Sequence, residues 1–234
     1  MLKWETFASY DALSARAAEL FLNAIHADPR VVFGLPTGRT PIGMYDRVVA
    51  ICSREYHCFT EVETFNLDEY IGISCDHPGS YCSYMREHLV EHVDLDRRRA
   101  HIPDGKAADL DAECARYERE IRRAGGLGVT FLGLGRNGHI GFNEPGTPFA
   151  SRTRVVSLTA STRTANAALF ANGDVPHDAI TMGIGTILES RSIVLLVSGT
   201  GKEDAVARLR SGEINEEFPA SALHLHGDVQ VLVS

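Results

Sequence analysis

The sequence predicts an α/β protein, a three-layer α/β/α sandwich with a mostly parallel central sheet. Strand-like and helix-like segments alternate along its 234 residues, and the strand-like segments are continuous apolar runs. Such runs are typical of a sheet that helices cover on both faces. Hydrophobic residues make up 44% of the chain, which is enough for a substantial core. We expect one domain over residues 1–234, because the sequence contains no repeat, low-complexity tract or Pro/Ser linker.

The hydrophobic period predicts each element in turn. Residues 4–7 form a short strand, and residues 10–25 have the 3.6-residue period of an amphipathic helix. The later strands are expected at residues 31–35, 62–67, 129–134, 154–159, 192–198 and 229–234. The later helices are expected at residues 41–52, 111–123, near 165–170 and at 202–212.

Charge and composition exclude several classes of function. The net charge of -8 and the pI near 5.7 argue against a nucleic-acid or anionic-membrane surface, and no apolar run approaches membrane-spanning length. The five cysteines are odd in number and show no C-x-x-C spacing, which predicts reduced thiols. We therefore expect a cytoplasmic protein whose partner is a small molecule.

The stretch GLGRNGHIGFNEP at residues 133–145 begins with the dinucleotide-binding pattern G-x-G-x-x-G. Two glycines and a proline follow in IGFNEP, so no helix opens there to receive a pyrophosphate. No acidic residue lies between Glu144 and Asp174, where a ribose partner would be expected. The stretch instead provides a polar cluster of Asn137, His139, Asn143 and Glu144 on a glycine-rich loop.

Polar loops follow four of the predicted strands, at the carboxyl edge where open α/β sheets bind ligands. These loops are LPTGRTP, DEY, RNGHIGFNEP and SGTGK.

Two of the four loops are suited to an anion. In the first, Gly38 permits close backbone approach, Thr37 and Thr40 bring hydroxyls, and Arg39 brings a cation. Lys202 would supply a charge from the opposite wall. Each loop alone is equally compatible with an ordinary strand-to-helix turn, but together on one edge they favour an anion site.

Asp68 and His139 are the candidates for acid/base chemistry. Because consecutive strand residues point to opposite sides, at most one of Asp68 and Glu69 is expected to face a cleft. His139 has Glu144 and Asn137 close in sequence, where they could fix its tautomer or raise its basicity. This combination beside an anion site indicates proton transfer on a sugar phosphate, and it requires no cofactor.

Metal and serine-hydrolase sites are less favoured by the sequence. His88 and His92 are one helical turn apart but are expected on a solvated helix face. His224 and His226 lie in a short strand-like run without a nearby cysteine. We expect no metal site, and the G-x-S-x-G motif of serine hydrolases is absent from the sequence.

Long motifs in order resemble the glucosamine-6-phosphate deaminase family. They are GLPTGRTPIGMY, TFNLDEYIG, HPGSYCSYMREHLVEHVD, DAECARYEREI, GLGRNGHIGFNEPG, SRTRVVSLT and AITMGIGTIL. The resemblance implies a cofactor-free reaction on an aminosugar phosphate, which is opened, isomerised and deaminated to fructose 6-phosphate and ammonia. It also implies that Asp68 moves a proton between C2 and C1, and that His139, supported by Glu144 and Asn137, opens the ring.

The same resemblance assigns phosphate binding to Gly38, Arg39, Thr40 and Lys202. Two positions depart from the family pattern. Some members have aspartate where this chain has Asn137, and Ala168 stands where the family has a phosphate-binding arginine. We hypothesise that Arg39 or Arg163 compensates for that loss.

Longer regulated members of the family continue past the last strand, so the end at VQVLVS predicts an unregulated monomer or low-order homo-oligomer. Three rival functions remain open: a deaminase of the galactosamine epimer, a 6-phosphogluconolactonase, and a non-catalytic sugar-phosphate sensor. The lactonase is disfavoured because Phe142, Asn143 and Glu144 replace its loop pattern. The sensor is disfavoured because it would not need Asp68 and His139.

Overall fold

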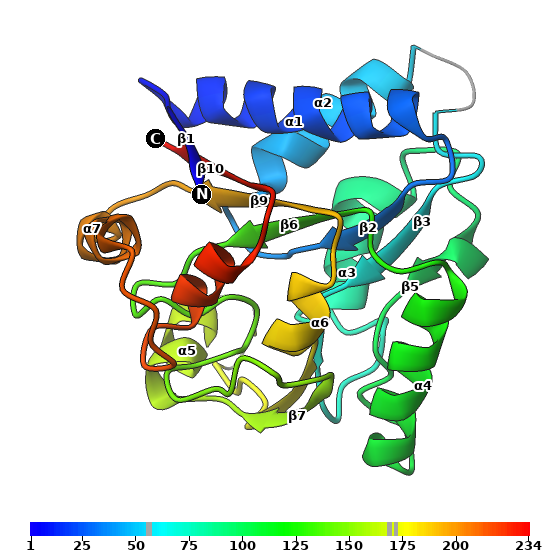
Figure 1. Ribbon diagram of the computed structural model, residues 1–234. Helices are drawn as coiled ribbons and strands as arrows, with labels where there is room; N and C mark the ends of the chain where they lie inside the picture. Colours follow the sequence, from blue (N-terminus) through cyan, green and yellow to red (C-terminus); the bar gives the residue numbers. More distant parts are fainter. Residues whose placement is uncertain (55–57, 168–169, 171–172) are drawn as a thin grey trace.

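A parallel sheet of seven strands lies at the centre of the computed structural model, which describes residues 1–54, 58–167, 170 and 173–234 (Figure 1). The strand order is β1-β10-β9-β6-β2-β3-β5, and every neighbouring pair is parallel. The strands are β1 (Lys3–Thr6), β2 (Val32–Leu35), β3 (Glu63–Asn66), β5 (Ala100–His101), β6 (Val129–Gly133), β9 (Ser192–Val197) and β10 (Val229–Val233). The predicted parallel sheet is confirmed.

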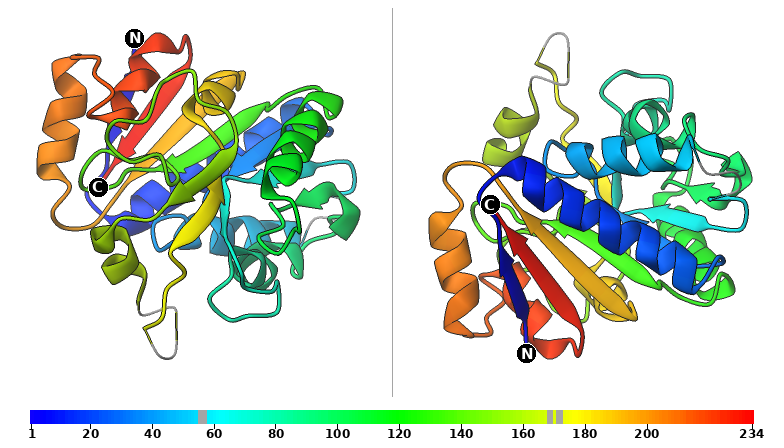
Figure 2. Two further views of the ribbon diagram at one scale, coloured as in Figure 1. Left: turned by 90° about the horizontal axis from the view of Figure 1, so that it is seen from below. Right: turned by 90° about the horizontal axis from the view of Figure 1, so that it is seen from above.

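Helices cover both faces of this sheet, which confirms the three-layer prediction (Figures 1 and 2). One face carries α1 (Tyr10–Ala27), α2 (Ile42–Cys52), α3 (Tyr81–Met85) and the π-helix η1 (Arg86–Val90). The other face carries α4 (Leu110–Arg123), α6 (Ile184–Leu188), α7 (Glu203–Ser211) and the 3₁₀ helix η4 (Pro219–Leu225). A short 3₁₀ helix, η2 (Arg97–Arg99), precedes β5. Among the described residues, no helix has the length and apolar composition needed to cross a bilayer.

Two hydrophobic clusters fill the spaces between the layers. Alternate residues of β9 supply them, with Ile193, Leu195 and Val197 in one cluster and Val194 and Leu196 in the other. This division follows from the two-residue period of a strand. It explains why the central strands are apolar throughout rather than alternating with polar residues.

A second, antiparallel sheet lies beside the site edge and was not predicted from the sequence. Its order is β4-β8-β7, formed by β4 (Asp68–Tyr70), β8 (Asp178–Thr181) and β7 (Arg154–Ser157). The expected strand at residues 154–159 therefore exists but belongs to this small sheet. Because β4 follows β3 after the single residue Leu67, the chain turns directly from the large sheet into the small one.

The helix expected near residues 165–170 lies earlier in the chain. The observed helix, α5, spans Ala160–Asn166. The hydroxyl of Thr159 accepts a hydrogen bond from the Thr162 N–H, an N-cap that fixes the start of the helix. Residues 168 and 169, and with them the substitution at Ala168, lie outside the described residues.

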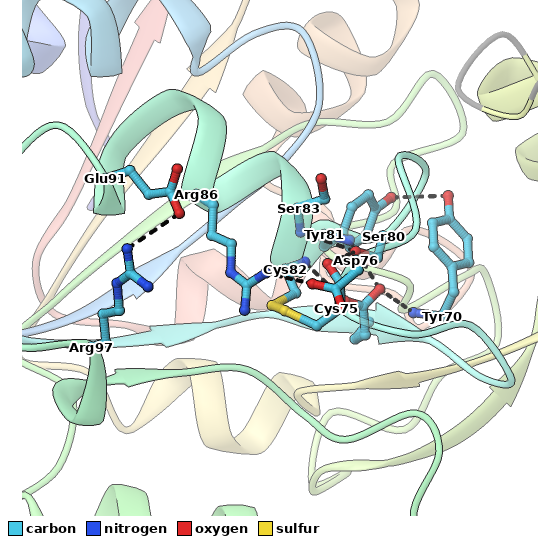
Figure 3. Close-up of a disulfide and its surroundings, with 11 residues drawn as sticks. Tyr70, Cys75, Asp76, Ser80, Tyr81, Cys82, Ser83, Arg86, Glu91 and Arg97 are labelled. Carbon is cyan, nitrogen blue, oxygen red and sulfur yellow. Dashed lines mark hydrogen bonds and ion pairs between the residues drawn. A yellow bond between two sulfur atoms is a disulfide. The ribbon is translucent and has the colours of Figure 1, made fainter.

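The prediction that all cysteines are reduced is wrong for one pair. Cys75 and Cys82 form a disulfide, seven residues apart in sequence, with Cα atoms 5.0 Å apart (Figure 3). Cys82 lies in the first turn of α3, and Cys75 lies in the loop that leads to it. Spacing alone does not reveal this pairing, because it depends on the loop folding back over the start of the helix. The disulfide closes this loop beside Tyr70 and Tyr81.

The strand-like run that contains His224 and His226 is in fact the 3₁₀ helix η4 and its end. The His224 Nε2 lies 2.8 Å from the Leu209 carbonyl oxygen, and the His226 Nε2 lies 2.7 Å from the Ser190 carbonyl oxygen. Both rings thus bind backbone groups of neighbouring elements.

We expect the disulfide to stabilise the folded protein. Cross-linking a loop of about eight residues removes chain entropy from the unfolded state worth about 2.5 kcal/mol. The double variant Cys75→Ser/Cys82→Ser should lose about that amount from its free energy of unfolding in urea without reductant. A reducing agent should bring the wild type to the level of the variant and leave the variant unchanged. Equal stabilities without reductant would contradict the prediction.

Candidate active site

The carboxyl ends of β2, β3, β6 and β9 meet at one edge of the large sheet, as the sequence predicts. In the strand order β9, β6, β2 and β3 are consecutive neighbours. The segments that follow these strands carry Thr37–Thr40, Asp68, Asn137–Glu144 and Lys202, which include every residue that the sequence proposed for catalysis or phosphate binding. The topology therefore brings segments more than 160 residues apart to one edge.

Asp68 is a buried carboxylate without a counter-charge. Only 5% of the residue is exposed, and the described part of the chain gives its carboxylate neither a hydrogen-bond donor nor a cation. A methyl group placed on Gly141 would lie 3.4 Å from Asp68 Oδ2 and 3.3 Å from Thr181 Oγ1, so the loop after β6 packs closely against the carboxylate. Burial, followed by the charge of Glu69, raises the pKa of Asp68 to about 8. The group is thus poised to take up a proton near neutral pH.

Glu69 points to the other side of β4, as the strand period predicts, and has a different environment. Its carboxylate accepts hydrogen bonds from the backbone N–H groups of Tyr70, Tyr81 and Cys82, at 2.8–3.0 Å. Burial raises the pKa of Glu69, and these three donors offset part of that rise. Of the two neighbouring carboxyl groups, Glu69 is therefore the better one to hold a negative charge, and its charge makes Asp68 more basic.

Three tyrosines hold the loop at residues 36–40 by its carbonyl oxygens. Tyr45 donates to the Pro36 oxygen at 2.6 Å, Tyr84 donates to the Gly38 oxygen at 2.7 Å, and Tyr10 lies against the next two carbonyls. In the described part of the chain, no acceptor takes the N–H groups of residues 37–40. A loop whose carbonyls are turned away and whose amides are unused is suited to bind an anion.

A chain of hydroxyl groups joins this loop to α5. The Tyr70 and Tyr81 hydroxyl oxygens are 3.2 Å apart (Figure 3). The Thr37 side chain lies close enough to Tyr81, and the Asn166 side chain close enough to Tyr70, to lower the pKa of each hydroxyl. Tyr70 and Tyr81 are buried, and both lie close enough to Asp68 for its charge to raise their pKa values, after the larger effect of burial. Thr37 and Asp68 therefore belong to one site.

His139, Asn137 and Glu144 form a connected group in which Asn137 is the central member. The Asn137 Oδ1 lies 2.8 Å from the His139 Nδ1, and the Asn137 Nδ2 donates to Glu144 Oε2 at 2.6 Å. Glu144 itself is 3.8 Å from the His139 Nδ1. Because the amide oxygen can only accept, Nδ1 carries the proton and Nε2 is left with its lone pair. Glu144 also accepts from Thr162 Oγ1 at 2.5 Å, which ties the group to α5.

Lys202 lies near this group and influences it. Burial lowers the pKa of His139, Glu144 raises it, and Lys202 lowers it again. Burial and the neighbouring charge of Arg136 lower the pKa of Lys202. His139 is consequently held in its neutral form at neutral pH, with Nε2 available as a proton acceptor.

Two of the three glycines in the G-x-G-x-x-G pattern, Gly135 and Gly138, serve packing, which supports the rejection of a dinucleotide site. A side chain on Gly135 would come within 2.4 Å of the His139 ring, and one on Gly138 within 2.1 Å of the Phe218 ring. Gly138 also has a φ of 89°, which favours glycine. Residues 134–153, all of them described, form turns and no helix.

Asn143, which the sequence grouped with the polar cluster, has a structural role instead. It is fully buried, its Nδ2 donates to the Ile140 and Met182 carbonyls at 2.9 Å, and Arg154 donates to its Oδ1. These bonds fix the turn that presents Gly141 to Asp68.

Sequence reasoning missed several neighbours of the site. Thr181 and Tyr81 flank Asp68, Thr162 supports Glu144, and Arg136 lies beside Lys202. Thr181 and Tyr81 occur within motifs that carry the family resemblance, which was the available signal. Of the two arginines offered as compensation for Ala168, Arg39 is exposed and Arg163 lies 3.3 Å from His177 Nε2.

Comparisons with known proteins show the family to which the chain belongs. Residues 6–232 match the family model described as glucosamine-6-phosphate isomerases/6-phosphogluconolactonase. A glucosamine-6-phosphate deaminase of Bacillus velezensis is 50% identical over 229 residues, which are 97% of this chain and 95% of that protein. Glucosamine-6-phosphate deaminase 1 of Bacillus subtilis is 50% identical over 226 residues, 96% of this chain and 93% of the relative.

Solved structures share the fold. A monomeric glucosamine-6-phosphate deaminase matches with a TM-score of 0.96 and 49% identity, and the match covers 99% of this chain and 96% of the deaminase chain. A 6-phosphogluconolactonase of Thermotoga maritima matches with a TM-score of 0.76 over 100% of both chains, at 15% identity. The second likeness is one of fold alone.

The burial of Asp68 predicts how stability depends on pH. Between about pH 4 and pH 8 the folded state keeps a proton on Asp68 that the unfolded state has released, so this group makes the protein less stable as pH rises. Asp68→Asn removes the effect. Its advantage in free energy of unfolding over wild type should grow by about 2–4 kcal/mol from pH 5 to pH 8 and then level off.

Urea unfolding of both proteins across this pH range measures the difference. Asp46→Asn, which changes an exposed carboxylate on α2, is the matched control and should show no such trend. A constant difference between Asp68→Asn and wild type would show that Asp68 titrates normally.

Proposed function

Because the chain belongs to the family of glucosamine-6-phosphate isomerases and 6-phosphogluconolactonases, we propose that it is a glucosamine-6-phosphate deaminase. It converts glucosamine 6-phosphate and water to fructose 6-phosphate and ammonia. The observation that carries the proposal is that the buried Asp68 and a neutral His139 lie on segments that meet at one edge of the sheet. Deaminases of two Bacillus species at 50% identity support it.

The first step is ring opening, in which a proton leaves O1 of the sugar and another reaches the ring oxygen. His139 performs this transfer through Nε2, the nitrogen that Asn137 leaves unprotonated. As His139 takes up a proton it becomes a cation, which Glu144 stabilises through Asn137 and across 3.8 Å. Asn137 is therefore the residue that keeps the ring in the useful tautomer.

The second step is the isomerisation. Asp68 removes the proton from C2 of the open-chain aldose while O1 takes up a proton from a water molecule, which gives an enolamine, and the same carboxyl group returns the proton to C1. The hydroxide that remains adds to the resulting C2 iminium, and loss of ammonia leaves the ketose. The C2 proton is weakly acidic, so a base with a pKa of about 8 is better matched to the task than an ordinary carboxylate.

The phosphate group binds at the amides and side chains of the loop at residues 37–40, with Lys202. Thr37, Gly38, Arg39 and Thr40 contribute from one wall and Lys202 from the other. Binding energy at this remote group orients C1 and C2 toward Asp68. The proposal includes that Arg39 or Arg163 compensates for the phosphate-binding arginine that Ala168 replaces. A KM that stays constant in Arg39→Ala would exclude Arg39.

We further propose one domain over residues 1–234, acting in the cytoplasm as a monomer or low-order homo-oligomer. The family match over residues 6–232 supports the single domain, and the monomeric deaminase of similar structure supports the low oligomeric state.

Turnover tests the proposal directly. Ammonia release should be seen from glucosamine 6-phosphate and not from galactosamine 6-phosphate, and 6-phosphogluconolactone should not be hydrolysed. Asp68→Asn should lose about 10²–10⁴-fold in kcat, because a general base contributes that much. Asp46→Asn should retain wild-type activity. Ammonia release from galactosamine 6-phosphate alone would show that the protein is the other deaminase. Binding of either aminosugar phosphate without turnover would show that it is a sensor.

The pH profile tests the role of Asp68 separately. We expect kcat/KM to rise with pH up to about 8, since the base must lose its proton in the free enzyme. The charge of Glu69 raises the pKa of Asp68, so Glu69→Gln should move this limb to lower pH. Ionisation of the substrate would not respond to the substitution. A limb that stays in place would therefore exclude Asp68 as its cause.

A further inference from the structure

Arg136 lies beside Lys202 on the site edge, and sequence reasoning gave it no role. Its guanidinium packs against the loop after β9, because a methyl group on Gly201 would lie 3.2 Å from Arg136 Nε. Arg136 NH2 also lies 3.4 Å from the Thr200 carbonyl oxygen. The next residue along the loop is Lys202, so two cationic side chains lie next to each other.

These two cations lack acidic partners in a chain rich in acidic residues. The chain has 31 acidic and 23 basic residues, and Arg16, Arg116 and Arg152 each lie against a glutamate. Among the described residues, no carboxylate lies within ion-pair distance of Arg136 or Lys202. Lys202 is half-buried while the Arg136 side chain is exposed, and two neighbouring like charges repel each other unless an anion lies between them. Burial lowers the pKa of Lys202, and the charge of Arg136 lowers it further, which is the effect expected of two neighbouring cations.

Arg136 lies in the same hydrogen-bonded turn as His139. Gly135 donates from its N–H to the His139 carbonyl at 2.9 Å, and Asn137, on the other side of Arg136, is bound to His139 and Glu144. Arg136 therefore projects from the same turn that carries the ring-opening group. Lys202 is close enough to His139 to lower its pKa, so the two cations and the histidine share one end of the site.

We propose that Arg136 and Lys202 together bind the phosphate group of the substrate, with Arg136 as a second cationic ligand. The inference rests on the proposed function, whose substrate carries that phosphate. Two cations match the double negative charge of a phosphate monoester, and a guanidinium can hold two of its oxygens at once. Arg136 thus supplies positive charge at this site independently of residue 168.

The experiment compares Arg136→Ala and Arg136→Lys with wild type. In turnover of glucosamine 6-phosphate, Arg136→Ala should raise KM about 10- to 100-fold and leave kcat within about threefold, because a charge-assisted phosphate contact is lost. Arg136→Lys should fall between, since it keeps the charge and loses the fork. Arg123→Ala, at the end of α4 and therefore at the opposite edge of the sheet, is the matched control and should behave as wild type.

Calorimetric titration with inorganic phosphate supplies a readout that does not need turnover. Arg136→Ala should weaken phosphate binding by about the same factor as it raises KM. If KM and phosphate affinity both stay within about twofold of wild type, or if only kcat falls, the inference is overturned while the deaminase assignment stands. If wild type binds phosphate, Arg136→Ala does not, and neither releases ammonia, the proposed function fails and the anion site stands.

Discussion

The cost of removing the Asp68 carboxylate from water is the constraint on which the site depends. Strand β4 carries this side chain into a buried place close to Gly141, Thr181 and the buried Tyr70 and Tyr81. A neighbouring charge of the same sign, on Glu69, increases the cost. No cation among the described residues offsets this cost, so the carboxyl group stays basic. The same feature that weakens the fold at high pH gives the site its base.

Among the described residues, the other polar groups of the site form hydrogen bonds with one another or with the backbone and not with Asp68. Three backbone N–H groups hold Glu69, an amide oxygen fixes His139, and tyrosine hydroxyls hold the carbonyl oxygens at residues 36–40. Each of these polar groups has a fixed partner, which makes the arrangement rigid before substrate arrives. Pre-organisation of this kind is what orients a flexible open-chain sugar for proton transfer.

Sequence reasoning predicted the large sheet and the four site loops because both depend on local patterns. Apolar runs indicate covered strands, and the carboxyl ends of neighbouring strands meet at one edge. It missed the small sheet, because β4 and β8 are short and pair across 110 residues. It also missed the Cys75–Cys82 disulfide and the neighbours Tyr81, Thr181 and Arg136. Their proximity arises only when loops from different strands fold against one another, which periodicity does not report.

Burial makes Asp68 a base with a pKa of about 8, and direct titration of its carboxyl group tests this value. The carboxyl carbon resonance of Asp68 would be followed by nuclear magnetic resonance in protein labelled at aspartate, and Asp68→Asn would assign the signal. We expect a midpoint at a pH of about 8. A midpoint near the ordinary value of 3.8 would contradict it, because Asp68 would then be an ordinary ionised carboxylate at neutral pH.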